Sequence, residues 1–273
     1  NISNSNDYQS IQNQFDATFR LNNKFRVKGQ MNHTHISATS KNYSRPEIGN
    51  ALNAMMNAEY RWLQEKVLFE LGTRYASFNG NDAVLPFGGI SVSPLANIPI
   101  SFSASASQSA RFATLNEMYW QPGGNALLEA EKGELVELGL NYQTETSNLK
   151  LTAFRGAYTN RIRWLPNGGV FSPTNVDYSL SQGIDLFIEK KLSLNQHTLS
   201  LGGNGQFIDA QGGLSKNDTK KLSYIPEFSA NISAEYTYEK FRLNYTHLFL
   251  DKRFISNDES AYMPSYQLSS ISG

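Results

Sequence analysis

The sequence between residues 99 and 142 reads PISFSASASQSARFATLNEMYWQPGGNALLEAEKGELVELGLNY. From Ile100 to Ser107 apolar residues alternate with serines, and from Val136 to Tyr142 they alternate with Glu137, Gly139 and Asn141. Successive side chains of a β-strand point to opposite faces, so each segment predicts a strand with one apolar and one polar face. The polar and aromatic residues between them predict a long loop. Soluble β-proteins and membrane barrels share this pattern, and the rest of the chain has to distinguish them.

The composition narrows the class of protein. The 273 residues include no cysteine, which excludes disulfides, thiolate metal sites and a cysteine nucleophile. Lys+Arg and Asp+Glu number 24 each, and the resulting zero net charge argues against a nucleic-acid partner. The mean hydropathy is −0.44, and no apolar run reaches the ~18 residues of a spanning helix. The 14 Tyr, 16 Phe and 3 Trp nevertheless suit a transmembrane barrel, in which every second strand residue faces lipid.

Alternating segments recur along the whole chain, and no segment shows a sustained helical period. We predict about thirteen antiparallel strands, near residues 11–21, 25–41, 52–63, 67–75, 87–95, 100–107, 136–142, 148–164, 179–192, 197–210, 228–238, 241–249 and 265–272. Many have roughly ten residues or more, the length that crosses a bilayer at a tilt. Because no linker or composition shift marks a second domain, we expect residues 1–273 to form part of one barrel.

The connections between these strands alternate in length. Short turns are expected near 22–24, 64–66, 96–97, 145–147, 193–195 and 239–240, and long loops near 42–50, 79–86, 113–133, 165–177, 211–221 and 256–264. Outer-membrane barrels have short periplasmic turns and long extracellular loops, so the pattern favours a transmembrane β-barrel over a soluble β-sandwich or lectin. The polar strand faces would then line the lumen. Thirteen strands cannot close a bacterial barrel of even strand number, so the full protein is expected to be larger.

The central part of the chain resembles the TonB-dependent outer-membrane receptors, and among them the cobalamin-receptor-like branch. One block of matching residues is RFATLNEMYW at 111–120, PGGN at 122–125, Leu128, Glu131 and VELGL at 136–140. A second block is Ala153-Phe154, IRWLP at 162–166, FSPTNV at 171–176 and GID at 183–185. The first block is similar to the family pattern R-x-P-T-x-x-E-L-Y followed by G-N-P-x-L-x-P-E and E-x-G. Ala113, Ala126 and Ala130 stand where the family usually has proline.

The resemblance implies a 22-stranded barrel of the Gram-negative outer membrane, of which this chain would supply strands 8 to 20. It also implies an N-terminal plug that binds a TonB-type energy-coupling complex, and neither the plug nor the coupling motif is expected in these residues. The ligand would be cobalamin or, as the alternative, a ferric siderophore. Outer-membrane lipid and a surface lipoprotein are the further partners expected. A passive porin-like or adhesive barrel is the alternative outside this family.

Four aromatic residues are candidates for binding the solute. Tyr119 and Trp120 lie in the longest loop, and Trp164 and Phe171 lie near the predicted extracellular end of the eighth strand. Large solutes are commonly bound by aromatic side chains with a few placed polar groups. Trp164 also suits an aromatic girdle, which is the interpretation we favour for Trp62.

Three charged residues, Glu70, Arg74 and Arg111, are expected to face the lumen or the plug, and Arg111 is also expected to anchor the long loop.

The sequence offers little for an enzyme or a metal centre, so we expect neither and no cofactor. His33 and His35 share a strand face, but their spacing alone is weak evidence for a metal. His197 and His247 lack an apparent Asp/Ser constellation, although such a constellation is spatial and sequence alone does not exclude it. Loop carboxylates at Asp218, Asp258 and Glu259 are of the type that binds Ca²⁺, but a solvated loop is the expected state.

Overall fold

The structure, a computed structural model, describes residues 7–95, 98–213, 219–256 and 259–273. These residues form sixteen β-strands and one short helix. The elements are β1 Asp7–Arg20, β2 Phe25–Thr39, β3 Glu47–Trp62, β4 Val67–Phe78, β5 Asn81–Val92, β6 Ile100–Arg111, α1 Leu115–Tyr119, β7 Glu131–Gln143, β8 Ser147–Asn167, β9 Val170–Leu194, β10 His197–Gly213, β11 Thr219–Lys221, β12 Phe228–Tyr238, β13 Phe241–Leu250, β14 Arg253–Phe254, β15 Tyr262–Met263 and β16 Tyr266–Ser272.

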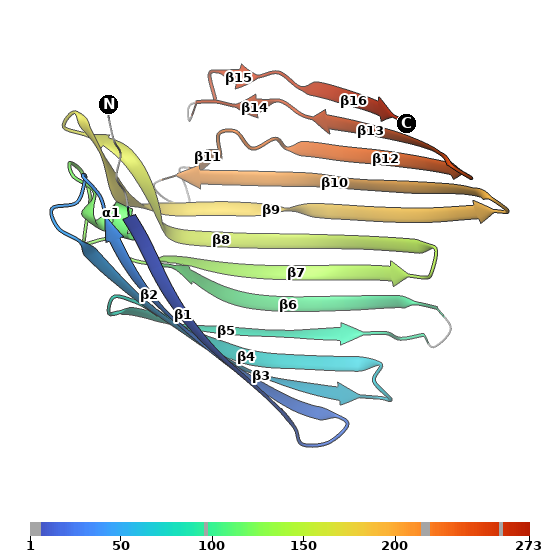
Figure 1. Cartoon of the computed structure of the whole chain (residues 1–273), viewed down its shortest axis with the longest axis horizontal. Coiled ribbons are helices and arrows are strands. Elements are labelled where there is room, and N and C mark those ends of the chain that lie inside the picture. Colours follow the sequence, from blue (N-terminus) through green and yellow to red (C-terminus); the bar gives the residue numbers. More distant parts are fainter. Residues whose placement is uncertain (1–6, 96–97, 214–218, 257–258) are drawn as a thin grey trace. The chain divides into compact units, whose positions relative to one another are not determined.

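Thirteen of the described strands pair in chain order in one sheet, β1 to β10 followed by β12, β13 and β16 (Figure 1). Strand β11 pairs with β10 outside this path, and β14 and β15 form a separate two-stranded sheet. The strands pair antiparallel, for example β1 with β2, where Phe15 lies opposite Met31, and β3 with β4, where Ala58 lies opposite Leu71. The predicted all-β, antiparallel architecture is therefore confirmed.

The chain divides into two compact units that share several strands, and each is described by itself. Unit 1 is Asn1–Gly89, Ala106–Glu134 and Ala157–Tyr178, and unit 2 is Ile90–Ser105, Leu135–Gly156 and Ser179–Gly273. Unit 1 contains β1 to β4 and α1. Unit 2 contains most of β9 together with β10 to β16.

Each unit exposes a row of apolar side chains along its strands. On β4 in unit 1, Phe69, Leu71 and Tyr75 are exposed, Leu71 to 72%. On β9 in unit 2, Ile184, Leu186, Ile188, Leu192 and Leu194 are exposed. Soluble proteins rarely expose continuous apolar surface of this kind, whereas a transmembrane strand presents it to lipid.

Two of the predicted long loops are wrong, because the strands continue into tight hairpins. Residues 79–86 were expected to be a loop, but β4 and β5 are joined by only Asn79 and Gly80, with φ of 49° and 88°. Residues 165–177 were expected to be another, but β8 and β9 are joined by Gly168 and Gly169, with φ of 59° and 89°. A type I′ turn needs positive φ at both central residues, which Asn-Gly and Gly-Gly supply.

Other predicted loops contain additional structure. The loop at 113–133 contains α1, β11 pairs with the end of β10 within 211–221, and β15 lies within 256–264. The expected turn at 96–97 lies outside the described residues. None of the helices in the described part of the chain is long and apolar enough to cross a membrane.

Candidate functional site

The long loop between β6 and β7 is a folded structure that begins with a capped helix. Thr114 precedes α1, and its side chain accepts a hydrogen bond from the Glu117 backbone N–H at 3.2 Å. The Thr114 backbone N–H in turn donates to Glu117 Oε2 at 2.8 Å. This reciprocal arrangement is a capping box, and the T-x-x-E spacing that encodes it is visible in the sequence although our sequence analysis overlooked it.

Arg111 connects the helix to the neighbouring strands. Its two terminal nitrogens donate to Glu117 at 3.0 to 3.2 Å, and Nη2 also donates to Glu131 Oε1 at 2.7 Å. Glu131 Oε1 accepts a further bond from the Ile162 backbone N–H at 2.7 Å. The guanidinium therefore joins β6 to α1 and β7, and Glu131 extends the contact to β8.

An apolar cluster fixes the inner side of the loop. Its buried members are Ala38, Ala113, Leu115, Met118, Leu128 and Ile162, and Tyr43 and Tyr119 pack against it. Tyr43 Oη donates to Asn116 Oδ1 across the cluster edge. Burial first, and then the nearby carboxylate of Glu47, raise the pKa of Tyr43, so the phenol stays protonated and able to donate.

The second half of the loop is fixed to the start of β9. A Cβ at Gly123, where φ is 117°, would collide with the carbonyl oxygen of Phe171. Ser172 Oγ donates to the Gly123 carbonyl at 2.7 Å, and Asn125 Nδ2 donates to the Pro173 carbonyl at 3.2 Å. Asn175 accepts from the Glu129 backbone N–H at 2.9 Å and donates to the Glu129 carbonyl at 3.0 Å. Several residues of the family-like blocks therefore hold the loop in place.

A groove of about 640 Å³ lies between this loop and the β8–β9 hairpin of unit 1. Its aromatic and apolar wall is Trp120, Pro122, Trp164, Val170 and Phe171, and its polar side is Thr114, Asn116 and Glu117. Trp164 is 37% exposed and Phe171 62% exposed, so both rings are open to a ligand. Three of the four predicted solute-binding residues therefore lie together. Tyr119 lies instead against the apolar cluster.

Two of the three residues predicted to face the lumen or plug, Glu70 and Arg74, lie on the polar face of β4, whereas Arg111 ends β6. Glu70 and Arg74 alternate with the exposed Phe69, Leu71 and Tyr75, so they point to the opposite side of the strand. Asn57 Nδ2 donates to Glu70 Oε1 at 2.7 Å. Arg74 Nε is buried without a hydrogen-bond partner among the described residues.

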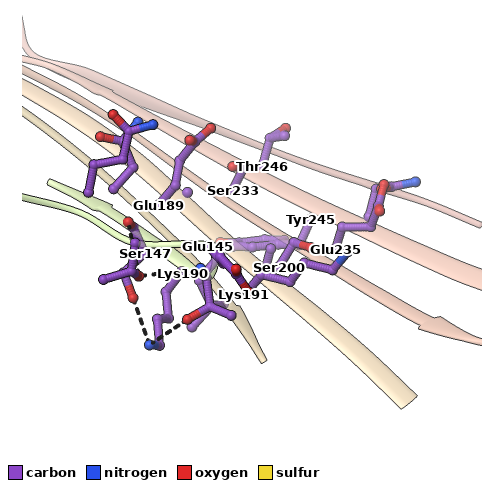
Figure 2. A pocket seen from close by; sticks show the side chains of 18 residues that line it. Glu145, Ser147, Glu189, Lys190, Lys191, Ser200, Ser233, Glu235, Tyr245 and Thr246 are labelled. Carbon is purple, nitrogen blue, oxygen red and sulfur yellow. Dashed lines mark hydrogen bonds between the residues drawn. The ribbon is translucent and has the colours of Figure 1, made fainter. Parts of the chain in front are cut away.

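A second hollow, of about 520 Å³, lies in unit 2 and is mainly polar. Ser200, Ser233 and Thr246 line it from three neighbouring strands (Figure 2). Glu189 and Lys190 follow each other on β9 and point to opposite sides in Figure 2. Lys190 Nζ donates to Ser147 Oγ at 2.7 Å and thereby ties β9 to the start of β8.

The histidines and loop carboxylates form no metal cluster among the residues that the structure describes. His35 Nδ1 lies 2.8 Å from Asn50 Oδ1, and His197 stacks on Tyr238. His247 Nδ1 lies 2.8 Å from Ser269 Oγ, a serine–histidine contact that the sequence could not show. Glu259 accepts from the Lys221 backbone N–H, whereas Asp218 and Asp258 lie outside the described residues.

The chain was compared with known proteins. A family model described as TonB dependent receptor-like, beta-barrel matches residues 1–273. The vitamin B12 transporter BtuB of Vibrio vulnificus is 26% identical over 103 residues, which make up 37% of this chain and 17% of that protein. The FrpB iron transporter of Neisseria meningitidis has a TM-score of 0.77 at 14% identity, covering 98% of this chain and 48% of that chain. A mutant of the ferric enterobactin receptor PfeA of Pseudomonas aeruginosa also has a TM-score of 0.77 at 14% identity, covering 97% and 46%.

The chain spans about half the length of these two structures and less of the curated relative. The match over residues 1–273 confirms the resemblance seen in the sequence and the expectation that the chain is not an enzyme. In an outer-membrane barrel of this family, the exposed apolar strand faces contact lipid. The chain therefore belongs to the TonB-dependent receptor-like β-barrel family of the Gram-negative outer membrane.

Proposed function

We propose that this chain is part of a receptor that imports a large, scarce solute across the outer membrane. The observation that carries the proposal is the groove in which Trp120, Trp164 and Phe171 meet beside an anchored loop. Aromatic walls with a few fixed polar groups are typical of sites for bulky solutes. The groove lies at the end of the strands that carries the 112–130 loop, which we infer to be extracellular because outer-membrane barrels have their long loops outside.

Cobalamin is the leading ligand in this proposal, and a ferric siderophore is the alternative. The partial sequence relative is named a vitamin B12 transporter, which supports the first. The structural neighbours are named for iron and ferric enterobactin, but at 14% identity they support the fold and not the ligand.

The proposal includes an energy-coupling complex, outer-membrane lipid and a surface lipoprotein as partners. A plug domain of the full protein would face the polar side of β4, where Glu70 and the unpaired Nε of Arg74 offer it charged and hydrogen-bonding groups. A TonB-type complex would act on that plug. The exposed apolar rows would contact outer-membrane lipid, and a surface lipoprotein is a further candidate at the outer end.

Calorimetric titration of the intact receptor in detergent tests the ligand, with cyanocobalamin and a panel of ferric siderophores run in parallel. We expect saturable binding of cyanocobalamin, weakened about tenfold or more by Trp120→Ala or Phe171→Ala, since buried aromatic contacts dominate binding. Trp62→Ala is the matched control, because Trp62 ends β3 away from the groove-lining residues. If only a siderophore binds, it replaces cobalamin as the proposed ligand. If Trp120→Ala and Phe171→Ala bind the ligand as Trp62→Ala does, the groove is not part of the binding site.

A further inference from the structure

The segments that form the groove carry no positive charge. Residues 112–131 include three carboxylates, Glu117, Glu129 and Glu131, and no lysine or arginine. Residues 164–176 include no charged residue at all. The basic residues Arg111, Lys132 and Arg163 flank these segments.

Arg111, the cation that ends β6 just before this loop, is already paired with carboxylates. Arg111 is not among the residues that line the groove, and its guanidinium is bonded to both Glu117 and Glu131. Two carboxylates share this guanidinium, and Arg161 also interacts electrostatically with Glu131. Glu129 adds another carboxylate, which accepts from Asn160 Nδ2 at 2.7 Å. The described residues that line the groove therefore include one carboxylate, Glu117, and no lysine or arginine.

Resting on the proposed function, we propose that the groove selects a net-neutral solute with a broad apolar or aromatic face and rejects polyanionic ferric chelates. An anionic chelate would lose its hydration against the aromatic wall, and the described lining residues offer no lysine or arginine to replace that hydration. The carboxylate in the groove lining, Glu117, would also disfavour it. A neutral corrinoid or a neutral ferric trihydroxamate meets neither penalty, because it binds through its faces and neutral polar groups.

The charge of the ligand is tested with three probes on the intact receptor in detergent. Cyanocobalamin and ferrichrome are net neutral, whereas ferric enterobactin is a trianion. We expect at least one neutral probe to bind about tenfold or more tightly than the trianion, since like-charge juxtaposition is costly. We also expect the affinity for the neutral probe to stay constant between low and high salt, because no ion pair is formed.

A pair of variants at Val170 separates charge from shape. Val170 lines the groove next to the β8–β9 turn, and its side chain is partly exposed. Val170→Lys should improve trianion binding about tenfold at low salt, whereas Val170→Gln, similar in length but uncharged, should not. Equal behaviour of the two variants would contradict the electrostatic explanation.

The binding results distinguish a failure of the charge selection from a failure of the proposed receptor function. Trianion binding as tight as that of the neutral probes, and abolished by Trp120→Ala, would overturn the charge selection and leave the receptor function standing. Failure of the folded receptor to bind any probe, whatever its charge, would overturn both.

Discussion

At the scale of single residues, Arg111 is the side chain on which the loop depends most. Its removal would leave Glu117 and Glu131 without their guanidinium, with side-chain exposures of only 12% and 16%. Because the guanidinium itself is 42% exposed, solvent screening moderates the cost. We expect Arg111→Ala to lower the local stability of residues 112–130 by about 1–2 kcal/mol. Hydrogen exchange of their amides should accelerate about tenfold or more.

Arg45→Ala is the control for this prediction. Arg45 also pairs with a carboxylate, Glu47, at 3.3 Å, but its side chain is 78% exposed and so the pair contributes little. Loop exchange in this variant should match the unmodified protein, and Arg111→Ala exchanging no faster than Arg45→Ala would refute the anchoring role. The sequence suggested Arg111 as an anchor, but not its partners, because Glu131 lies 20 residues away and the pairing is a product of the fold.

At the scale of elements, the β8–β9 hairpin positions half of the groove. Gly168 and Gly169 adopt positive φ with open space around them, so alanine would be strained by its backbone alone. The cost is about 1–2 kcal/mol for each position. We expect Gly168→Ala/Gly169→Ala to open the hairpin end more often and to raise the rate of trypsin cleavage after Arg163 about tenfold or more. The groove between Trp164 and Phe171 should loosen in the same variant.

Gly29→Ala tests whether the turn, and not glycine loss in general, is responsible. Gly29 lies within β2 with open space and no positive φ, so alanine should fit there without strain. Its cleavage pattern should equal that of the unmodified protein. If both variants were cleaved at equal rates, the positive-φ turn would have no part in holding the hairpin.

The strands were more predictable from the sequence than the hairpin turns and the groove. The alternation of apolar and polar residues predicted strands such as 228–238, because a strand with one apolar face has an apolar residue at every second position. The Asn79-Gly80 dipeptide is also a turn signal, which the long loop predicted at 79–86 overlooked. The groove was only partly predictable. Aromatic type suggested Trp120, Trp164 and Phe171, but their convergence depends on Gly123 packing on the Phe171 backbone, a contact that no periodicity records.

At the scale of the whole molecule, odd and even positions along each strand point to opposite faces, one apolar and one polar. We call this alternation the strand parity. On β7, Val136 and Leu138 are exposed, the latter to 59%, while Glu137 lies between them on the opposite face. A one-residue shift of register would reverse both faces, so the parity is strongly specified. The sequence predicts which strand residues share a face, because this needs only the period of two.

The parity makes a direct prediction for neighbouring residues on β7. Leu138→Arg places a charge on the lipid face, which costs about 2–4 kcal/mol near the bilayer midplane. Glu137→Arg places the same side chain in the polar lumen, where water and polar groups solvate it. We therefore expect a reduced folded fraction for Leu138→Arg and an unchanged one for Glu137→Arg, measured as the band of unboiled receptor that migrates as folded barrel in a detergent gel. Equal folded fractions in the two variants would mean that β7 has no lipid face. Loss in Glu137→Arg alone would mean that its faces are reversed, and the register of the neighbouring strands would have to be reversed with it.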